Sequence, residues 1–264
     1  MSRVTSTCAA ATYAFALAAS LAAPASAATF LFIRHAESTS NAGTATTVEE
    51  NLDPPLTPLG KEQAVDLAAI LDSYDVTAIY TSAYQRTQLT IAPTAAEFGL
   101  TPTVDARTNE WYLGDVMSLE EMAEVNAYGV IGAWAAGDHS AKANLPNAES
   151  LDDMAARVIP AWQEITRAHK DDKGVVLLVG HGAEIGFVMP YFAQNVSFDF
   201  AFANGLHNTG IVQLEFRGDQ PVVTNWQGTD MPAAVPLPAS GLLLLGGAGV
   251  LLARGLRRVQ SGAA

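Results

Sequence analysis

The chain has 264 residues, of which 49% are hydrophobic and 16% charged, and it can bury a full core as one large domain or two small ones. Its 14 Lys and Arg against 27 Asp and Glu give a net charge of −13, which disfavours nucleic acid as a partner, because binding a duplex requires a basic surface. The only cysteine is Cys8, so a disulfide framework, a cysteine metal cluster and a cysteine nucleophile are excluded from the remaining sequence.

The first residues, 1–27, have the features of a secretory signal peptide. Arg3 supplies a positive charge, the stretch 9–23 is apolar apart from two polar residues, and 25–27 is a small-x-small cleavage site. A buried N-terminal helix is the alternative, although a run of alanines makes a poor core helix. We therefore expect the mature chain to begin at Ala28.

The other end, residues 235–264, is predicted to be a sorting tail or a transmembrane segment. The motif Val235-Pro236-Leu237-Pro238 precedes the uncharged stretch 239–253, and three arginines follow that stretch. This order resembles the PEP-CTERM (VPxP-type) sorting tails of Gram-negative bacteria, which implies processing by an exosortase-type transpeptidase. A plain C-terminal membrane anchor is the alternative, and the stretch is short for one, since a spanning helix usually needs about 20 residues. Both interpretations place the region between the two ends outside the cytoplasm.

That region, 28–234, is predicted to be one domain with 10 basic and 27 acidic side chains, because the two ends carry four arginines and no acidic residue. In chain order, the predicted elements are a strand at 29–33, a helix at 58–71, a strand at 77–80, a helix at 85–98, a Gly-interrupted helix at 118–136, a helix at 150–168, a strand at 175–179 and a closing strand pair at 211–216 and 222–226. The alternation predicts an α/β fold, a three-layer α/β/α sandwich around a mostly parallel central sheet. Residues 111–149 are predicted to form a lid or specificity insertion, with a flexible loop at 138–147.

Helix boundary signals support several of these elements. Thr57 is predicted to cap the helix at 58–71, with Pro58 as its first residue. Ser150 and Asp153 have the spacing of a capping box at the start of the helix 150–168. Pro93 is expected to disturb the helix 85–98, because proline lacks a backbone donor.

Two histidines and two arginines follow the predicted strands. His35 and His181 come just after the two most apolar strands, Arg34 adjoins the first histidine, and Arg86 follows the strand between them in sequence. Because the carboxyl ends of parallel strands form the ligand crevice of such sheets, we expect these side chains to face one another. The positive charges repel one another in an empty pocket, and a bound dianion removes that repulsion. Guanidinium groups match the oxygens of a phosphate, which makes phosphate the expected dianion. An imidazole can also attack phosphorus as a nucleophile.

A series of ordered motifs surrounds these residues. They are Arg34-His35-Ala36-Glu37 with Asn41, Leu56 to Ala64, Thr81 to Thr87, Asn109 to Gly114, Ala148-Glu149-Ser150 leading to Arg157, and Val179-Gly180-His181-Gly182. In order and spacing they resemble the histidine phosphatase (phosphoglycerate mutase-like) superfamily, branch 1, over residues 29–216. Ala36 and Ala148 stand where that family usually has glycine. The first of these methyl groups is expected to narrow the pocket, and neither removes a reactive atom.

The resemblance implies a role for each matching residue. His35 attacks phosphorus and becomes phosphohistidine, and Glu110 protonates the leaving oxygen and then activates water. The phosphate is held by Arg34, Asn41, Arg86, His181 and the backbone N–H of Gly182. Neither a metal nor a cofactor is implied, since the arginines supply the positive charge.

Other polar residues have less distinctive positions. Glu110 has competitors for the role of the acid in the same region, namely Glu120, Glu121, Glu124 and Glu149. The remaining candidates are interpreted as structural or solvated: Glu37, His139, His169 and His207.

Hydrolysis of a small phosphomonoester outside the cytoplasm is the function that these observations favour. A mutase needs a sugar-acid phosphate that an exported protein does not meet, and the acidic body repels polyanionic substrates. Two alternatives stay open, a phosphoglycerate mutase-like phosphotransferase and a non-catalytic surface or matrix protein that binds phosphorylated ligands. The expected partners are the phosphoester, the exosortase-type enzyme and, before processing, the membrane. The expected location is the periplasm, outer surface or extracellular matrix of a Gram-negative bacterium.

Overall fold

The computed structural model describes residues 28–232, so the predicted signal peptide and the predicted sorting tail lie outside the described residues. The described strands are β1 (Thr29–Arg34), β2 (Val76–Thr81), β3 (Thr103–Val104), β4 (Val175–Gly180), β5 (Ile211–Arg217), β6 (Gln220–Trp226) and β7 (Thr229–Asp230). They form one sheet in the order β3-β2-β4-β1-β5-β6-β7. The first four strands in this order pair in parallel, and β5, β6 and β7 complete the sheet with antiparallel pairs.

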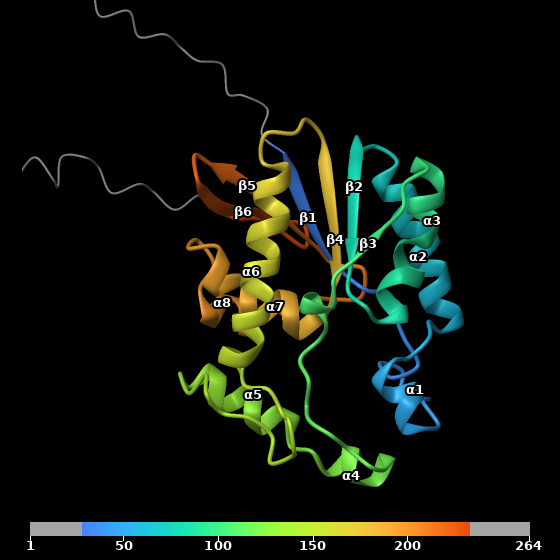
Figure 1. The fold of residues 1–264 in the computed structure, drawn as a ribbon, viewed down its shortest axis with the longest axis vertical. Coiled ribbons are helices and arrows are strands. Elements are labelled where there is room, and N and C mark those ends of the chain that lie inside the picture. Colours follow the sequence, from blue (N-terminus) through green and yellow to red (C-terminus); the bar gives the residue numbers. More distant parts are fainter. Residues whose placement is uncertain (1–27, 233–264) are drawn as a thin grey trace, which may run out of the picture.

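Helices cover both faces of this sheet (Figure 1). The described helices are α1 (Val48–Leu52), α2 (Pro58–Leu71), α3 (Gln85–Phe98), α4 (Leu119–Glu124), α5 (Ala127–Ala135), α6 (Leu151–His169), α7 (Gly182–Phe192) and α8 (Phe198–Ala203), with a 3₁₀ turn η1 (Ala106–Thr108). Helices α2 and α3 lie on one face, while α6 and α7 lie on the other. The predicted three-layer α/β/α fold is therefore confirmed. Within residues 28–232, none of the helices combines the length and the apolar character that crossing a membrane requires.

The alternation of side chains along β1 explains the two layers. Phe30 and Phe32 point to one face, where the Phe32 ring packs edge-on against Trp162 of α6 with 4.8 Å between ring centroids. Leu31 and Ile33 point to the other face and join the core beneath α2 and α3. Because both faces are buried, the strand reads as a continuous apolar run in the sequence.

The two predicted helix N-caps are confirmed. The Thr57 side chain accepts a hydrogen bond from the Gly60 N–H, and Ser150 and Asp153 form the capping box at the start of α6. Pro93 lies inside α3, which runs from Gln85 to Phe98, and it removes the hydrogen bond that the Leu89 carbonyl would otherwise accept.

The predicted single helix at 118–136 was wrong in part. The chain forms α4 and α5 with a break at Val125 and Asn126, because the Asn126 side chain accepts a hydrogen bond from the Gly129 N–H and starts a new helix. Together with α1, these helices lie beyond the carboxyl ends of the parallel strands (Figure 1).

Gly60 shows how closely α2 packs against the loop after β1. A Cβ atom at this position would collide with the backbone carbonyl of Glu37. We expect Gly60→Ala to lower the free energy of unfolding by about 2–3 kcal/mol, because neither backbone can move without losing its hydrogen bonds. Gly132→Ala in α5 is the control, since nothing lies within 4 Å of its added methyl group. Urea unfolding of both variants measures the difference, and equal stabilities would contradict the prediction.

Candidate active site

Three buried side chains from three strand ends meet at the carboxyl edge of the parallel strands. His35 follows β1, Arg86 lies in the first turn of α3 after β2, and His181 is the N-cap of α7 after β4. The two imidazole rings face each other with 5.2 Å between their centroids. The Arg86 Nε–H is 3.2 Å from both the Nε2 atom of His35 and the Nδ1 atom of His181. The structure therefore brings together the residues that the sequence placed at separate strand ends.

The hydrogen bonds of His35 fix which ring nitrogen carries the proton. Its Nδ1 lies 2.7 Å from the backbone carbonyl of Ala36, and a carbonyl can only accept, so Nδ1 is the protonated atom. The Nε2 atom then keeps a lone pair, which is directed toward Arg86. A neutral imidazole with a free Nε2 lone pair is the form that can act as a nucleophile.

His181 has the complementary arrangement. Its Nδ1 accepts from Arg86, so its Nε2 carries the proton and donates to the Ser82 hydroxyl at 2.8 Å. Its backbone N–H donates to the carboxyl group of Glu184, which is 1% exposed. These contacts fix the position of the ring at the bottom of the site, and burial raises the pKa of Glu184 well above its usual value.

Burial and the neighbouring Arg86 guanidinium hold the pKa of both His35 and His181 well below the usual value of 6.5. An unfolded chain binds protons at these rings more readily, so the stability they contribute is lost as the pH falls below about 6.5. We expect the ring signals of both histidines to keep their neutral-form chemical shifts from about pH 8 to about pH 6, as measured by NMR. A titration midpoint near 6.5 for either ring would show that it is not held neutral.

Arg34 approaches the same site from the end of β1. One of its terminal nitrogens donates to the Leu206 carbonyl at 2.5 Å, while its Nε atom is buried and has no hydrogen-bond partner among the described residues. The Gly182 Cα faces this guanidinium, and a Cβ atom there would lie 3.2 Å from the Arg34 Nε. As the first residue of α7, Gly182 also has a backbone N–H that the helix leaves without an acceptor. An anion at this point would satisfy both donors.

Asn41 lies at the exposed mouth of the site. Its side-chain oxygen accepts from the Ser38 backbone N–H at 3.3 Å and from the Asn208 amide at 3.2 Å. The same Asn208 amide donates to the His35 carbonyl at 3.0 Å. The oxygen of Asn41 is therefore engaged within the loop, which leaves its amide nitrogen as the donor toward a ligand.

Glu110 is held at the amino end of α7. One carboxylate oxygen accepts from the backbone N–H groups of Trp111 and Glu184, at 2.9 Å each, and the other accepts from the Ala183 N–H at 3.3 Å. These three N–H groups fix the position of the carboxyl group at the start of α7. With Arg86, Glu110 lines a cavity of about 150 Å³, which we call the catalytic cavity.

The competing carboxylates lie elsewhere. Glu149 makes an ion pair with Arg157 at 2.6 Å, and the same guanidinium donates to the Glu110 backbone carbonyl at 3.0 Å. Glu121 and Glu124 line a different cavity, and Glu120 lines neither. Of the five glutamates considered from the sequence, Glu110 alone lines the catalytic cavity.

Several residues of the site were missed in the sequence. The Tyr84 ring lies under the Arg86 guanidinium, 4.4 Å from its carbon, and packs edge-on against His181. The Leu52 carbonyl at the end of α1 accepts a hydrogen bond from Arg86 at 3.3 Å. Ser82 and Tyr84 lie in the motif around Arg86, where only the arginine was given a role. A backbone carbonyl such as that of Leu52 leaves no signal in the sequence.

The residues at the two departures from the family pattern pack away from the reacting groups. The Ala36 side chain is buried in a small cluster with Leu56 and Ala64, and it does not line the catalytic cavity, so the expected narrowing does not occur. Ala148 is buried against Gly114.

Glu37 accepts a hydrogen bond from the Thr57 hydroxyl at 2.7 Å, which agrees with its predicted structural role.

The described residues do not contain three His, Cys, Asp or Glu side chains grouped so that they could hold a metal ion. The charged groups around the catalytic cavity are instead Arg86 and Glu110, with Arg34 next to His35. This arrangement can bind a phosphoryl group, present a nucleophile to phosphorus and supply a carboxyl group to the leaving oxygen.

Comparison with known proteins agrees with this chemistry. A model of the histidine phosphatase superfamily (branch 1) matches residues 30–229. The chain is 29% identical over 190 residues to a glucosyl-3-phosphoglycerate phosphatase of Mycolicibacterium vanbaalenii, which covers 70% of this chain and 82% of that protein. A 2,3-bisphosphoglycerate-dependent phosphoglycerate mutase of Cytophaga hutchinsonii is 29% identical over 146 residues, covering 54% of this chain and 67% of the mutase.

Solved structures show the same relationship. The native structure of mycobacterial glucosyl-3-phosphoglycerate phosphatase has a TM-score of 0.60 and 26% identity, covering 76% of this chain and 99% of that chain. A structure described as mycobacterial hydrolase 1 has a TM-score of 0.62 and 25% identity, covering 78% of this chain and all of the other. The chain therefore belongs to the histidine phosphatase superfamily, branch 1, and is a phosphoric monoester hydrolase of that family.

Proposed function

We propose that the protein hydrolyses a small phosphomonoester outside the cytoplasm through a phosphohistidine intermediate on His35. The observation that carries this proposal is the unprotonated Nε2 atom of His35 beside Arg86 and His181, with all three side chains buried. Family membership supports the type of reaction, and the arrangement of the side chains supports the roles.

In the first step, the Nε2 atom of His35 attacks phosphorus and the bond from phosphorus to the leaving oxygen breaks. The Nε–H of Arg86, which lies between the two imidazoles, turns to the non-bridging oxygens of the phosphate, together with the donors of Arg34 and Gly182. His181 adds a donor there when its Nδ1 atom takes up a proton beside the bound phosphate, since its Nε2–H is held by Ser82. These groups stabilise the charge that spreads over the oxygens in the transition state. Glu110 transfers its proton to the leaving oxygen, so the product leaves as an alcohol.

In the second step, Glu110 accepts a proton from water, and the oxygen of that water attacks phosphorus. The bond between phosphorus and the Nε2 atom breaks, inorganic phosphate is released, and His35 regains its lone pair. The Nδ1–H of His35 stays on the Ala36 carbonyl throughout, so the ring carries a positive charge while Nε2 is bonded to phosphorus and leaves as a neutral imidazole. Asn41 adds a donor at the mouth of the pocket.

Hydrolysis is favoured over the two alternatives on separate grounds. A non-catalytic binding protein needs the arginines, but it does not need a carboxylate held at the helix end beside the phosphate site, as Glu110 is. A mutase needs a phosphorylated sugar acid as its partner, which the proposed location does not supply. The mutase and the phosphatases among the relatives share the phosphoryl-transfer site, so the product of the reaction decides between them.

Release of inorganic phosphate from p-nitrophenyl phosphate by the purified full-length chain tests the proposed function. We expect steady turnover that continues in EDTA, since the arginines replace a metal. Loss of turnover in EDTA would contradict the metal-free mechanism. Transfer of the phosphoryl group to an added sugar acid, with no free phosphate, would favour the mutase.

Export is the second part of the proposal, and it rests on the signal-like residues 1–27 and the tail at 235–264. Expression of the tagged chain in a Gram-negative host, followed by fractionation and mass spectrometry of the mature N-terminus, tests it. We expect a chain beginning at Ala28 outside the cytoplasm. An unprocessed chain in the cytoplasmic fraction would contradict the proposed location.

A further inference from the structure

Apart from two residues, the catalytic cavity is lined by uncharged side chains. Its aliphatic side chains and methionine are Leu52, Leu113, Val116, Met122 and Val125, and its uncharged polar ones are Ser40, Asn51, Tyr84 and Tyr112. Among the described residues that line this cavity, the charged ones are Arg86 and Glu110, and the proposed mechanism uses both for the phosphoryl group and the leaving oxygen. The part of the substrate next to the leaving oxygen therefore meets uncharged surface, without a spare cation to pair with a carboxylate.

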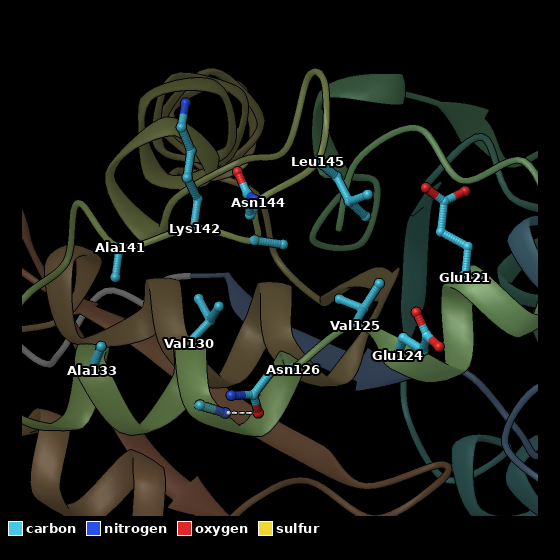
Figure 2. Close-up of a pocket in the computed structure, with 12 residues that line it drawn as sticks. Glu121, Glu124, Val125, Asn126, Val130, Ala133, Ala141, Lys142, Asn144 and Leu145 are labelled. Atoms are coloured by element: carbon cyan, nitrogen blue, oxygen red, sulfur yellow. Dashed lines mark hydrogen bonds between the residues drawn. The ribbon is translucent and has the colours of Figure 1, made fainter.

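A larger cavity of about 590 Å³ adjoins the catalytic cavity, and Val125 lines both. Figure 2 shows it between helices α4 and α5 and the loop that follows them, with Val125, Val130 and Leu145 directed into the gap. Its size suits a small organic group. Gly114 lines the catalytic cavity and Leu145 lines the second cavity. The two residues are in direct contact, since a Cβ atom on Gly114 would collide with the Leu145 side chain.

The charges of this second cavity are unevenly placed. Glu121 and Glu124 come from α4, the helix that also provides Met122 to the catalytic cavity. Lys142 is the basic residue among the residues that line the second cavity, and Figure 2 shows its ammonium group at the opposite end from the two carboxylates. Glu121 and Glu124 therefore lie on the side of the second cavity nearest Val125, the residue that it shares with the catalytic cavity.

We propose that these two adjoining cavities hold the leaving group of the substrate and select a leaving group without negative charge. The inference rests on the proposed function, because it concerns the alcohol that remains after phosphoryl transfer. A carboxylate in the catalytic cavity loses its water against apolar side chains and gains no cation in return. In the second cavity it also approaches Glu121 and Glu124, which repel it.

The substrate class is thus an uncharged alcohol or phenol with an apolar part beside the leaving oxygen. This differs from the phosphoglycerate-type compounds in the names of the relatives, since glycerate carries a carboxylate. The residues that carry the proposed preference come from 111–149 and from α1, while the phosphate-binding residues come from the strand ends.

A matched pair of substrates tests the proposal with the full-length protein. 4-Carbamoylphenyl phosphate and 4-carboxyphenyl phosphate share the ring and the leaving oxygen, and their amide and carboxylate have nearly the same shape. We expect kcat/KM, measured by phosphate release at neutral pH, to be at least about tenfold higher for the carbamoyl ester.

Two pairs of variants locate the effect. Met122→Lys adds a cation to the catalytic cavity and is expected to reduce the preference, whereas Met117→Lys adds the same charge at a side chain that is 86% exposed and should leave it unchanged. Glu124→Gln removes a cavity carboxylate and should also reduce the preference, whereas Glu120→Gln in the same helix should not. The preference is the ratio of kcat/KM for the carbamoyl ester to kcat/KM for the carboxy ester, measured in the same protein. A general loss of activity lowers both values and leaves this ratio unchanged.

Equal kcat/KM values for the two esters in the native protein would overturn the proposal, as would equal effects of the members of either variant pair. Turnover of p-nitrophenyl phosphate without turnover of the carbamoyl ester would overturn it as well, because an uncharged ring of that size must fit. Failure to release phosphate from any of the three compounds would instead contradict the proposed function.

Discussion

His35→Ala is expected to lower phosphate release from p-nitrophenyl phosphate by at least about 10⁴-fold, because it removes the nucleophile itself. Arg34, Arg86 and His181 stay in place and can still bind phosphate, so the loss falls on kcat. Steady-state rates of phosphate release measure it. The variant His35→Gln keeps most of the side-chain volume of this buried position, and it should be as inactive as the alanine variant.

His207→Ala is the control for this result, since His207 is exposed and its described hydrogen bonds are made by its backbone N–H and carbonyl. It should retain full activity. Circular dichroism of all three variants separates loss of the fold from loss of the nucleophile. Native turnover in a folded His35 variant would end the covalent mechanism.

Glu110→Gln is expected to lower the rate of hydrolysis of alkyl phosphates by about 10²–10⁴-fold, because the alkoxide then leaves without a proton. The amide oxygen of glutamine can still accept the N–H groups of Trp111 and Glu184, and only the longer contact with the Ala183 N–H is lost, so the local structure should remain. p-Nitrophenolate leaves without protonation, so its departure should be far less affected. The water that attacks phosphohistidine, however, has then lost its base. Stopped-flow measurements should therefore show a burst of about one nitrophenolate per chain, followed by slow steady turnover.

Glu120→Gln makes the same change of charge on helix α4, outside the catalytic cavity, and serves as the control. It should show native rates with both kinds of ester. If Glu110→Gln slowed alkyl and nitrophenyl esters equally and gave no burst, the residue would not act as the acid and base. Native activity of this variant would assign the role to another group.

The sequence predicted the central fold because its signals are local and strong. Continuous apolar runs gave the buried strands β1 and β4, and the caps at Thr57 and Ser150 placed the starts of α2 and α6. The segments that were missed are short or depend on tertiary contacts. Helix α1, for example, has five residues and contacts the site through the Leu52 carbonyl, which no side-chain pattern records.

The sequence predicted the charged residues of the site, but it did not predict the orientation of the imidazoles or the helices that line the cavities. Arg34, His35, Arg86 and His181 sit beside strand ends, where topology alone brings them together. The orientation of each imidazole depends on partners such as the Ala36 carbonyl and Ser82, which only the structure shows. Likewise, the predicted helix 118–136 was expected to be one element, and its break at Asn126 separates α4 from α5, the two helices that line the second cavity.

The most direct test of the account is to trap the intermediate. The full-length protein is mixed with ³²P-labelled substrate, quenched within one turnover in alkali and digested, and the labelled peptide is sequenced by mass spectrometry. The account predicts one acid-labile phosphate per chain on the imidazole of residue 35, absent from the His35→Ala variant. Turnover of the substrate without label on that residue, or label on a neighbouring residue such as Ser38, would contradict it.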